Sequence, residues 1–304
     1  MTSVLLATPD GVLRFADDAP SPEHELTGRC VSHLARQRDT WLAVVDDTVV
    51  ARRDAAGAWS DVATAAVGLA CLLPAPDGAW CGTRDGRLLR LLGGGLAPVT
   101  AFDAVDGRET WHAVPSGEPY VRSLTSTADS RAILAGVHVG GIVRSGNGGA
   151  SWRPTIDIEV DVHEVRAHPG DPRLVLAAAG YGLAVSRDAG ASWEMQTDGL
   201  HATYLRAVAF TTEAALVSAS DGPAGERSAL YRWTDGEPAL TKVDGGLPEW
   251  LHGNVDTGGL DASGELAALA DDGGTAYRSV DGGKTWTVLA AGVGPVLSVG
   301  VQPE

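Results

Sequence analysis

Positive charge is scarce in this sequence. Its 304 residues include 23 lysines and arginines against 39 aspartates and glutamates, which gives a net charge of -16 at pH 7. Proteins that hold nucleic acids or anionic lipids need a dense basic surface, and no lysine- or arginine-rich segment provides one. We therefore expect neither a nucleic acid nor a membrane as a partner.

Long hydrophobic runs and cysteine pairs are also missing. No stretch approaches the roughly 20 apolar residues of a membrane span. The first residues lack the basic segment and apolar run of a secretion signal, so we expect a cytoplasmic protein. The three cysteines, Cys30, Cys71 and Cys81, are odd in number and form no CxxC pair. This argues against a disulfide framework or a cysteine metal site, and favours small buried hydrophobic residues.

Glycine and short apolar runs are plentiful. The chain has 39 glycines and 44% hydrophobic residues, and its apolar runs are short and bounded by Asp or Gly, which is typical of β-strands and turns. A length of 304 residues suits one repeat-built domain, in which each unit buries its faces against its neighbours. We therefore expect an all-β protein with a single domain over residues 1–304.

Three segments repeat without a gap. Each fits the pattern S-x-[DN]-x-G-x-[ST]-W, and they are Ser145–Trp152, Ser186–Trp193 and Ser279–Trp286. In such a tight turn, Asp or Asn accepts backbone hydrogen bonds, Gly adopts angles that other residues avoid, and Trp packs on the hairpin. A decayed fourth copy, Arg52–Trp59, keeps only the spacing from Asp to Trp. The pattern predicts structure rather than chemistry.

The spacing of these turns predicts the architecture. The first two intact copies are about 41 residues apart and the other intervals are about twice that, a period typical of propeller blades. Cycles of four short strands begin near residues 32, 67, 120, 161, 204 and 255. The C-terminal run 296–301 can join the N-terminal strands in one further blade and so remove open edges. We predict a seven-bladed β-propeller of four-stranded antiparallel blades, with six blades as the alternative.

On these segments the chain resembles the Asp-box, or bacterial neuraminidase repeat (BNR), β-propellers. That superfamily includes sialidases, sortilin-type receptors and photosystem II assembly factors. The resemblance implies the fold but says little about function. A sialidase also needs an arginine triad, an Arg-Ile-Pro motif and a tyrosine nucleophile paired with Glu. Here Arg-Ile-Pro is missing and His163 occupies the middle arginine position, so we expect a protein that is not a sialidase.

The innermost strands suggest where a site lies. They align on one buried residue each, Leu124, Val165 and Val208. This alignment gives Arg122, His163 and Arg206 equivalent positions where the strands begin, with Asp256 as the counterpart in the last blade. Loops expected at the same end of the blades add further residues: His138, His201, Tyr204, Trp250, His252 and Asn254. A long insertion, roughly 102–119, carries Trp111 and His112, and we expect it to cover the opening as a lid.

These residues support several readings that the sequence leaves open. Arginines 122 and 206 suit an anionic or polar small molecule, Tyr204 and Trp250 offer stacking faces, and histidines can transfer protons. A peptide or protein partner is the other occupant we consider. As an enzyme, a lyase or hydrolase, the site would use His163, Tyr204 and Arg206.

Two further readings concern the same residues. Four histidines, His138, His163, His201 and His252, could surround a divalent transition metal, the one cofactor that we consider. Alternatively, Arg122, His163, Arg206 and Asp256 form only a hydrated salt-bridge network that fills a polar channel. Glu164 should alternate away from His163 and is not expected to act as a base.

Overall fold

The computed structural model describes residues 2–17, 19, 21–112 and 119–304. The chain divides into two compact units, one of residues 35–195 and one of residues 1–34 with 196–304. The division falls inside two strands, β4 (Val31–Gln37) and β19 (Glu194–Gln196). We describe each unit by itself.

The 35–195 unit holds four sheets, and its described residues also form three short helical segments outside them. Its remaining strands are β5 (Thr40–Val45), β6 (Val49–Arg53), β7 (Trp59–Thr64), β8 (Leu69–Ala75), β9 (Gly78–Thr83), β10 (Leu88–Leu92), β11 (Gly95–Pro98), β12 (Val121–Ser126), β13 (Ile133–Val137), β14 (Gly141–Ser145), β15 (Arg153–Pro154), β16 (Val162–Ala167), β17 (Val175–Ala179) and β18 (Gly182–Ser186). The helix α1 (Thr100–Asp103) and the 3-10 helix η1 (Arg108–Thr110) follow β11, and a second 3-10 helix, η2 (Ile158–Val160), precedes β16.

The other unit holds three sheets. Its strands are β1 (Ser3–Thr8), β2 (Gly11–Ala16), β3 (Glu23–Glu25), β20 (Tyr204–Phe210), β21 (Ala215–Ser220), β22 (Ala229–Trp233), β23 (Thr241–Lys242), β24 (Leu260–Ser263), β25 (Leu266–Ala270), β26 (Thr275–Ser279), β27 (Thr287–Ala291) and β28 (Ser298–Gln302). Among all described residues no helix is long and apolar enough to cross a membrane.

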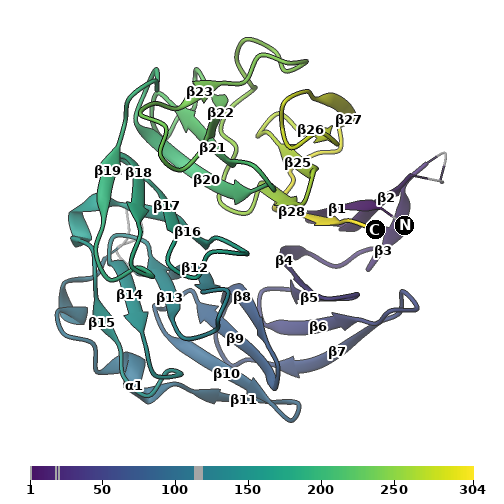
Figure 1. The fold of residues 1–304 in the computed structure, drawn as a ribbon. Coiled ribbons are helices and arrows are strands. Elements are labelled where there is room, and N and C mark those ends of the chain that lie inside the picture. The colour runs from purple at the N-terminus through teal and green to yellow at the C-terminus, as the bar shows by residue number, and fades with distance from the viewer. Residues whose placement is uncertain (1, 18, 20, 113–118) are drawn as a thin grey trace. The chain divides into compact units, whose positions relative to one another are not determined.

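Every sheet formed by the described residues has four strands, and there are seven such sheets. Six of them run in chain order, as in β12-β13-β14-β15 and β16-β17-β18-β19, with antiparallel pairing between neighbours. Each such four-stranded antiparallel sheet is one blade of a propeller. Figure 1 labels the strands that make up the blades. The prediction of a seven-bladed β-propeller is confirmed, and the six-bladed alternative is wrong because both chain ends contribute to a seventh sheet.

The seventh sheet has the order β28-β1-β2-β3. Its C-terminal strand pairs antiparallel with the N-terminal strand, so that Val4 faces Val301 and Leu6 faces Val299, and the two strands lie side by side in Figure 1. The predicted shared blade is therefore correct. Pairing the two ends of the chain satisfies backbone groups that would otherwise leave an open sheet edge.

The second strand of a blade can be apolar on both faces because neighbouring sheets cover both. In β17 all five residues, Val-Leu-Ala-Ala-Ala, are buried. Polar links add to this packing, since the Ser123 hydroxyl accepts a hydrogen bond from the backbone of Val165 at 3.0 Å and the Thr125 hydroxyl accepts one from Ala167. These two bonds fix the register of β12 against β16, the first strands of two adjacent blades.

The three repeated turns lie between the third and fourth strands of their blades, as the pattern predicts. In one of them Asp188 accepts hydrogen bonds from the Ala191 and Ser192 backbone N–H groups at 2.9 Å and from the Ser192 hydroxyl at 2.6 Å. Gly190 has φ +78°, and a Cβ there would lie 2.1 Å from the side chain of Leu134 in the next blade. Only glycine fits both the turn and the neighbour.

The segment expected to form a lid starts as part of the core. Phe102 and Trp111 are buried, and their rings contact one another with centroids 5.7 Å apart. Phe102 also packs edge-on against Trp152, the tryptophan that closes a repeated turn, at 5.2 Å. Residues 113–118 lie outside the described part of the chain, so the lid itself stays a prediction.

The hydrogen bonds of the repeated turns predict a pH-dependent stability. Partial burial alone would raise the pKa of Asp188, but the bonds from Ser192, Ser186 and Ala191 outweigh it and lower this pKa from 3.8 to about 2. An acid with a depressed pKa stabilises the folded state fully above its unfolded pKa, and this contribution disappears as the pH falls toward the folded pKa.

We therefore expect Asp188→Asn to lower the free energy of unfolding at pH 7 by about 1 kcal/mol, a modest value because the carboxylate is exposed and screened. Urea unfolding at pH 7 and at pH 3 measures the effect, which should shrink at the lower pH. Asp106→Asn removes a charge from an exposed loop of the same unit and should change the stability at neither pH. An equal loss of stability at both pH values would show that the ionised Asp188 carboxylate is not the source of the stabilisation.

Candidate functional site

The first strand of several blades carries a β-bulge at the same position. In β12 the register shifts between Val121 and Ser123, and in β16 between Val162 and Glu164. A third shift, in β20, lies between Leu205 and Val208. The bulged residues therefore include Arg122, His163 and Arg206, which supports the equivalence inferred from the sequence. A bulge re-aims a side chain relative to regular pleating.

In the 35–195 unit, two adjacent blades bring a group of polar side chains together. His138 lies on the loop between β13 and β14, and Asp161 lies between η2 and β16, next to the bulged His163. Nε2 of His138 is 3.5 Å from one carboxylate oxygen of Asp161, and Nε2 of His163 is 3.3 Å from the other. We call these three residues, with Tyr120 and Arg122, the histidine cluster.

The other two members of the cluster, Tyr120 and Arg122, lie on the His138 side. The Tyr120 and His138 rings are 5.1 Å apart, and the His138 and His163 rings are 6.1 Å apart. The Arg122 guanidinium lies 5.9 Å from the centre of the Tyr120 ring. His163 is fully buried, whereas the side chains of His138 and Asp161 keep 12% and 28% of their exposure. The cluster is therefore reached through His138 and Asp161.

Asp161 is the most constrained member of the cluster. Its backbone has φ +53°, a left-handed conformation that Asp and Asn tolerate better than most residues. Contact with His163 lowers the pKa of its carboxyl group, partial burial opposes this, and the charges of His163, His138 and Arg122 lower it further. Among the described residues, no donor reaches the buried Oδ1 atom in hydrogen-bond geometry. The group is an ionised carboxylate with unused acceptor capacity.

Sequence reasoning missed Asp161. The available signal was its place two residues before His163 in Asp-Val-His, at the start of a first strand. Nothing in the sequence reveals that its backbone turns left-handed and brings the carboxylate back toward the imidazole. Glu164, which we did not expect to act as a base, is indeed buried in an ion pair with Arg166 at 2.9 Å.

The remaining predicted residues belong to the other unit, where a second polar group forms around Arg206. The guanidinium group contacts Asp256 at 2.9 Å and the Tyr204 hydroxyl at 3.3 Å, and its Cζ lies 5.3 Å from the Tyr204 ring centre. Burial raises the pKa of nearby Asp272, while the charge of Arg206 opposes that increase. The Arg206 charge is thus already compensated by acidic groups of its own unit.

His201 is held by hydrogen-bond partners at both ring nitrogens. Nδ1 lies 2.8 Å from the Tyr231 hydroxyl and Nε2 lies 3.0 Å from the Arg227 carbonyl oxygen. Because a carbonyl only accepts, Nε2 carries the proton and Nδ1 accepts from Tyr231. The Trp250 ring packs 4.9 Å from His201 and receives the Lys242 ammonium at 3.7 Å. This environment fixes His201 and Trp250 as parts of a packed surface.

His252 and Asn254 occupy the loop before β24. His252 is exposed, whereas the buried Asn254 donates from its side chain to the Pro223 carbonyl oxygen at 3.0 Å. Of the four histidines predicted as metal ligands, His138 and His163 lie together in one unit, and His201 and His252 belong to the other. The four-histidine arrangement stays a prediction, while the geometry favours a smaller set that contains Asp161.

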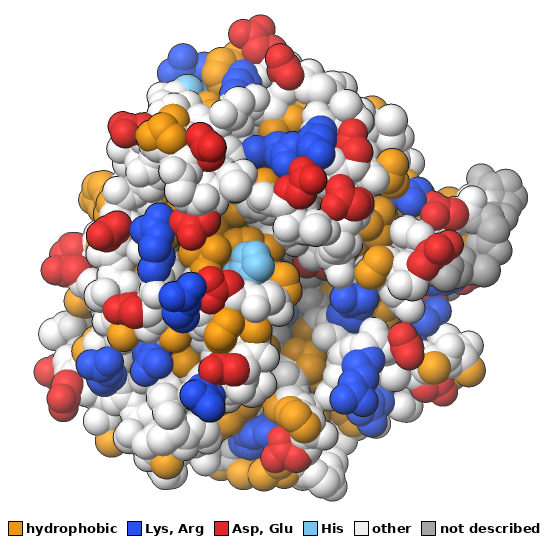
Figure 2. Space-filling view, viewed as in Figure 1, with side chains coloured by type: hydrophobic (Ala, Val, Ile, Leu, Met, Phe, Trp, Pro, Cys, Tyr) orange, Lys and Arg blue, Asp and Glu red, His pale blue; other side chains and the backbone are white. Residues whose placement is uncertain are grey.

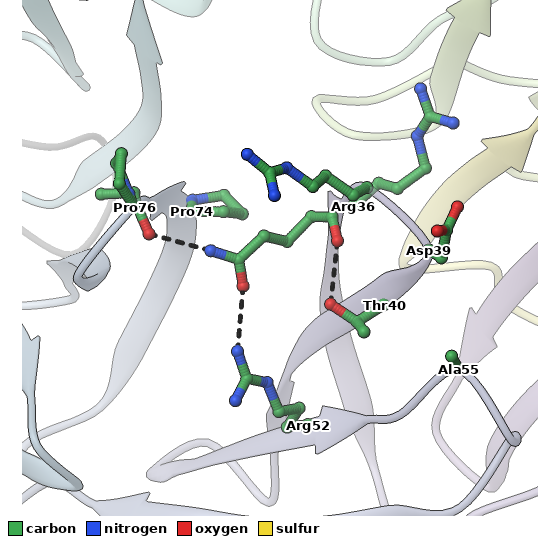
Figure 3. Close-up of a pocket in the computed structure, with 10 residues that line it drawn as sticks. Arg36, Asp39, Thr40, Arg52, Ala55, Pro74 and Pro76 are labelled. Carbon is green, nitrogen blue, oxygen red and sulfur yellow. Dashed lines mark hydrogen bonds between the residues drawn. The ribbon is translucent and has the colours of Figure 1, made fainter.

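A pocket that the sequence analysis did not predict lies at the hairpin between β4 and β5. It has a volume of about 610 Å³ and is lined by three arginines, Arg36, Arg38 and Arg52. The Gln37 side chain donates to the Ala75 carbonyl oxygen at 2.8 Å and accepts from Arg52 at 3.2 Å, as Figure 3 shows. All three arginines are exposed. We call this the arginine pocket.

Elsewhere the charges are mixed. On the face drawn in Figure 2, lysines and arginines are interspersed with acidic side chains and form no continuous basic patch.

Comparisons with known proteins identify the fold. No family model and no curated protein matches the chain. Among solved structures, it is similar to the GH74 xyloglucanase from Xanthomonas campestris, with a TM-score of 0.60 and 19% identity over 86% of this chain and 45% of that one. An ancestral GH74 enzyme has a TM-score of 0.60 and 15% identity over 90% of this chain and 38% of that one.

A third similar structure is YCF48 bound to D1 peptide. Its TM-score is 0.57, with 15% identity over 93% of this chain and 87% of that one. This chain spans less than half the length of either GH74 protein. At such identities the likeness shows a β-propeller, and it shows neither an Asp-box family nor an activity.

The Arg206 group predicts a stability change that depends on pH. Arg206→Gln leaves Asp256 and Asp272 without their cation, which raises the pKa of Asp272 further. A carboxyl group whose folded pKa is raised destabilises the protein above its unfolded pKa. We expect a loss of about 1–3 kcal/mol at pH 7, less than for a fully buried pair because Asp256 is half exposed.

Urea unfolding at pH 7 and pH 4.5 measures this loss, which should diminish at the lower pH as the carboxylates bind protons. Arg227→Gln breaks an exposed pair with Asp221 in the same unit and should leave the stability near that of the wild type. A loss that grows toward pH 4.5 would show that the cation does not compensate these acids.

Proposed function

We propose that the protein binds a small anionic or polar ligand at the histidine cluster. What supports this is one observation: two adjacent blades direct an arginine, a tyrosine and two histidines around Asp161, where their first strands begin. A guanidinium group recognises carboxylates and phosphates through two parallel hydrogen bonds. Tyr120 and His138 offer hydrogen-bonding groups and ring faces next to it.

We do not propose a sialidase activity for this protein. The Arg-Ile-Pro motif is missing from the sequence, and a histidine occupies the bulge where an arginine stands in the preceding and following blades. In the other unit, Arg206 is engaged by Asp256 at 2.9 Å, which leaves it less suited to grip an anionic ligand. The proposal concerns the cluster around Arg122 because it also contains two histidines and a tyrosine.

The neighbours with the same fold do not name the ligand. Two are GH74 enzymes and one is a structure of YCF48 with a D1 peptide, and one fold hosts many unrelated sites. Neighbouring side chains of the histidine cluster lie close together, with the Tyr120 and His138 rings 5.1 Å apart and the His138 and His163 rings 6.1 Å apart, which favours a small molecule over an extended peptide.

Malonate and inorganic phosphate are suitable probes, because they carry the two anionic groups that arginine recognises. We expect at least one of these two anions to bind the wild-type protein in calorimetric titrations. Arg122→Gln should weaken that binding about tenfold or more, because it removes a charged hydrogen-bond donor. Arg153→Gln, which removes the same charge from the exposed outer strand of the same blade, should leave binding unchanged.

The arginine pocket provides the competing location. If Arg52→Gln removes the binding while Arg122→Gln does not, the anion occupies the arginine pocket and the proposed site is wrong. Failure of both probes to bind the wild-type protein would also contradict the proposal, as would equal effects of Arg122→Gln and Arg153→Gln.

The contact between Asp161 and His163 supports a second candidate, an enzyme of the hydrolase type. A carboxylate beside an imidazole orients the ring, and an oriented histidine can serve as an acid or base in catalysis. We expect such an enzyme to release p-nitrophenolate from p-nitrophenyl phosphate or acetate, and His163→Gln to abolish the release. Absence of turnover by the wild-type protein would contradict this candidate and leave the binding proposal intact.

A further inference from the structure

The charge of Asp161 is the feature that anion binding leaves unexplained. The Asp161 carboxylate lies between two histidines at the centre of the histidine cluster, and its Oδ1 atom is buried without a donor in hydrogen-bond geometry among the described residues. Such an oxygen costs free energy unless a cation or donor compensates it. It would also repel the anion that Arg122 attracts.

The donor atoms around Asp161 suit a metal ion. One nitrogen of His138, one oxygen of Asp161 and one nitrogen of His163 all lie within 4.8 Å of one another. Atoms bound to one Zn²⁺ at about 2.0–2.2 Å lie roughly 3.0–3.5 Å apart. His138 Nε2 lies 3.5 Å from Oδ1 of Asp161 and His163 Nε2 lies 3.3 Å from Oδ2, so each histidine nitrogen is at such a separation from one carboxylate oxygen, and small side-chain shifts would bring the three donors to one ion.

The protein holds these donors from several sides. His163 is the bulged residue of β16 and is fully buried, so its ring has little freedom. Asp161 is fixed by its left-handed backbone and by the hydrogen bond from the Gly180 N–H group to its carbonyl oxygen at 3.0 Å. The His138 backbone N–H donates to the Tyr120 carbonyl oxygen at 3.0 Å. Strained, pre-organised donors of this kind concentrate at functional sites.

We propose that His138, Asp161 and His163 bind one divalent first-row transition ion, such as Zn²⁺, Co²⁺ or Fe²⁺, and that the anionic ligand binds to this ion beside Arg122. Two imidazoles and one carboxylate favour such ions over Mg²⁺ and Ca²⁺, which prefer oxygen ligands alone. Three protein ligands leave coordination positions open, and the exposed sides of His138 and Asp161 give access to them.

This inference rests on the proposed function and explains where its positive charge comes from. A divalent ion with one carboxylate and two neutral imidazoles has a net charge of about +1. The ion outweighs the charge of Asp161, which otherwise offsets that of Arg122, and so strengthens the attraction of the cluster for anions. No bond of the ligand is made or broken, so the proposal concerns coordination alone.

Co²⁺ is the probe for the site because its visible absorption reports the ligand geometry. After treatment with EDTA and its removal, we expect the full-length protein to take up one Co²⁺ with intense visible absorption, which Zn²⁺ displaces. Asp161→Asn keeps the shape and tolerates the left-handed backbone, yet should weaken Co²⁺ binding at least about a hundredfold, since the loss of supporting groups alone costs 10–100-fold. His138→Gln should behave in the same way.

His168→Asn is the matched control. His168 lies in the same unit but accepts hydrogen bonds from the Gly170 and Asp171 backbone through Nδ1, and asparagine retains an acceptor there. We expect this variant to bind Co²⁺ like the wild type. Unfolding in urea with EDTA present shows whether each variant is folded, so that a lost site is distinguished from a lost structure.

Titrating malonate with Zn²⁺ present and with EDTA present separates the two proposals. We expect malonate to bind at least about tenfold more tightly with Zn²⁺, and Asp161→Asn to remove that gain. If Co²⁺ fails to bind, or binds equally to Asp161→Asn, while malonate binding still depends on Arg122 in EDTA, the metal site is wrong and the proposed function stands. If Co²⁺ binds as expected but neither malonate nor phosphate binds under any condition, the anionic ligand is wrong.

Discussion

The bulge in the first strand of a blade is the constraint on which the candidate sites depend. Regular pleating would send alternate side chains into the two neighbouring sheets, where apolar residues belong. By inserting an extra residue opposite one partner, β12 and β16 present Arg122 and His163 without breaking the apolar pattern of the strand. Hydrogen bonds from Val165 to Ser123 and from Ala167 to Thr125 then fix the two strands in register, which places the bulges of adjacent blades next to one another.

The bulged residues His163 and Arg206 carry ionisable or cationic side chains, and each contacts an aspartate from a nearby loop. Asp161 approaches His163 from the segment just before the same strand, and Asp256 approaches Arg206 from the loop before the following blade. The outcome differs because Arg206 gains a partner for its permanent charge, whereas Asp161 lies 3.3 and 3.5 Å from two imidazole nitrogens and keeps a buried oxygen without a hydrogen-bond donor among the described residues. The same backbone device therefore gives a compensated pair in one unit and a set of metal-type donors in the other.

The sequence was sufficient for the fold because its signals are local and repeated. The turns ending in Trp152, Trp193 and Trp286 each encode a hydrogen-bonded loop of eight residues, and their spacing encodes the blade. Their apolar strands need no distant information to be assigned. The alignment of Arg122, His163 and Arg206 was also within reach, since the bulges recur at one distance from a buried anchor residue in each strand.

The candidate site could be predicted only in part, because its decisive contacts depend on backbone angles and loop packing. Asp161 looks like one more turn residue until its φ of +53° brings the carboxylate to His163. His201 is one histidine among several in the sequence, which does not reveal that its ring nitrogens lie beside the Tyr231 hydroxyl and the Arg227 carbonyl oxygen. The arginine pocket depends on Gln37 bridging from its hairpin to the next blade. In each case the residue type was visible in the sequence, whereas its partner was set by a turn that no short pattern specifies.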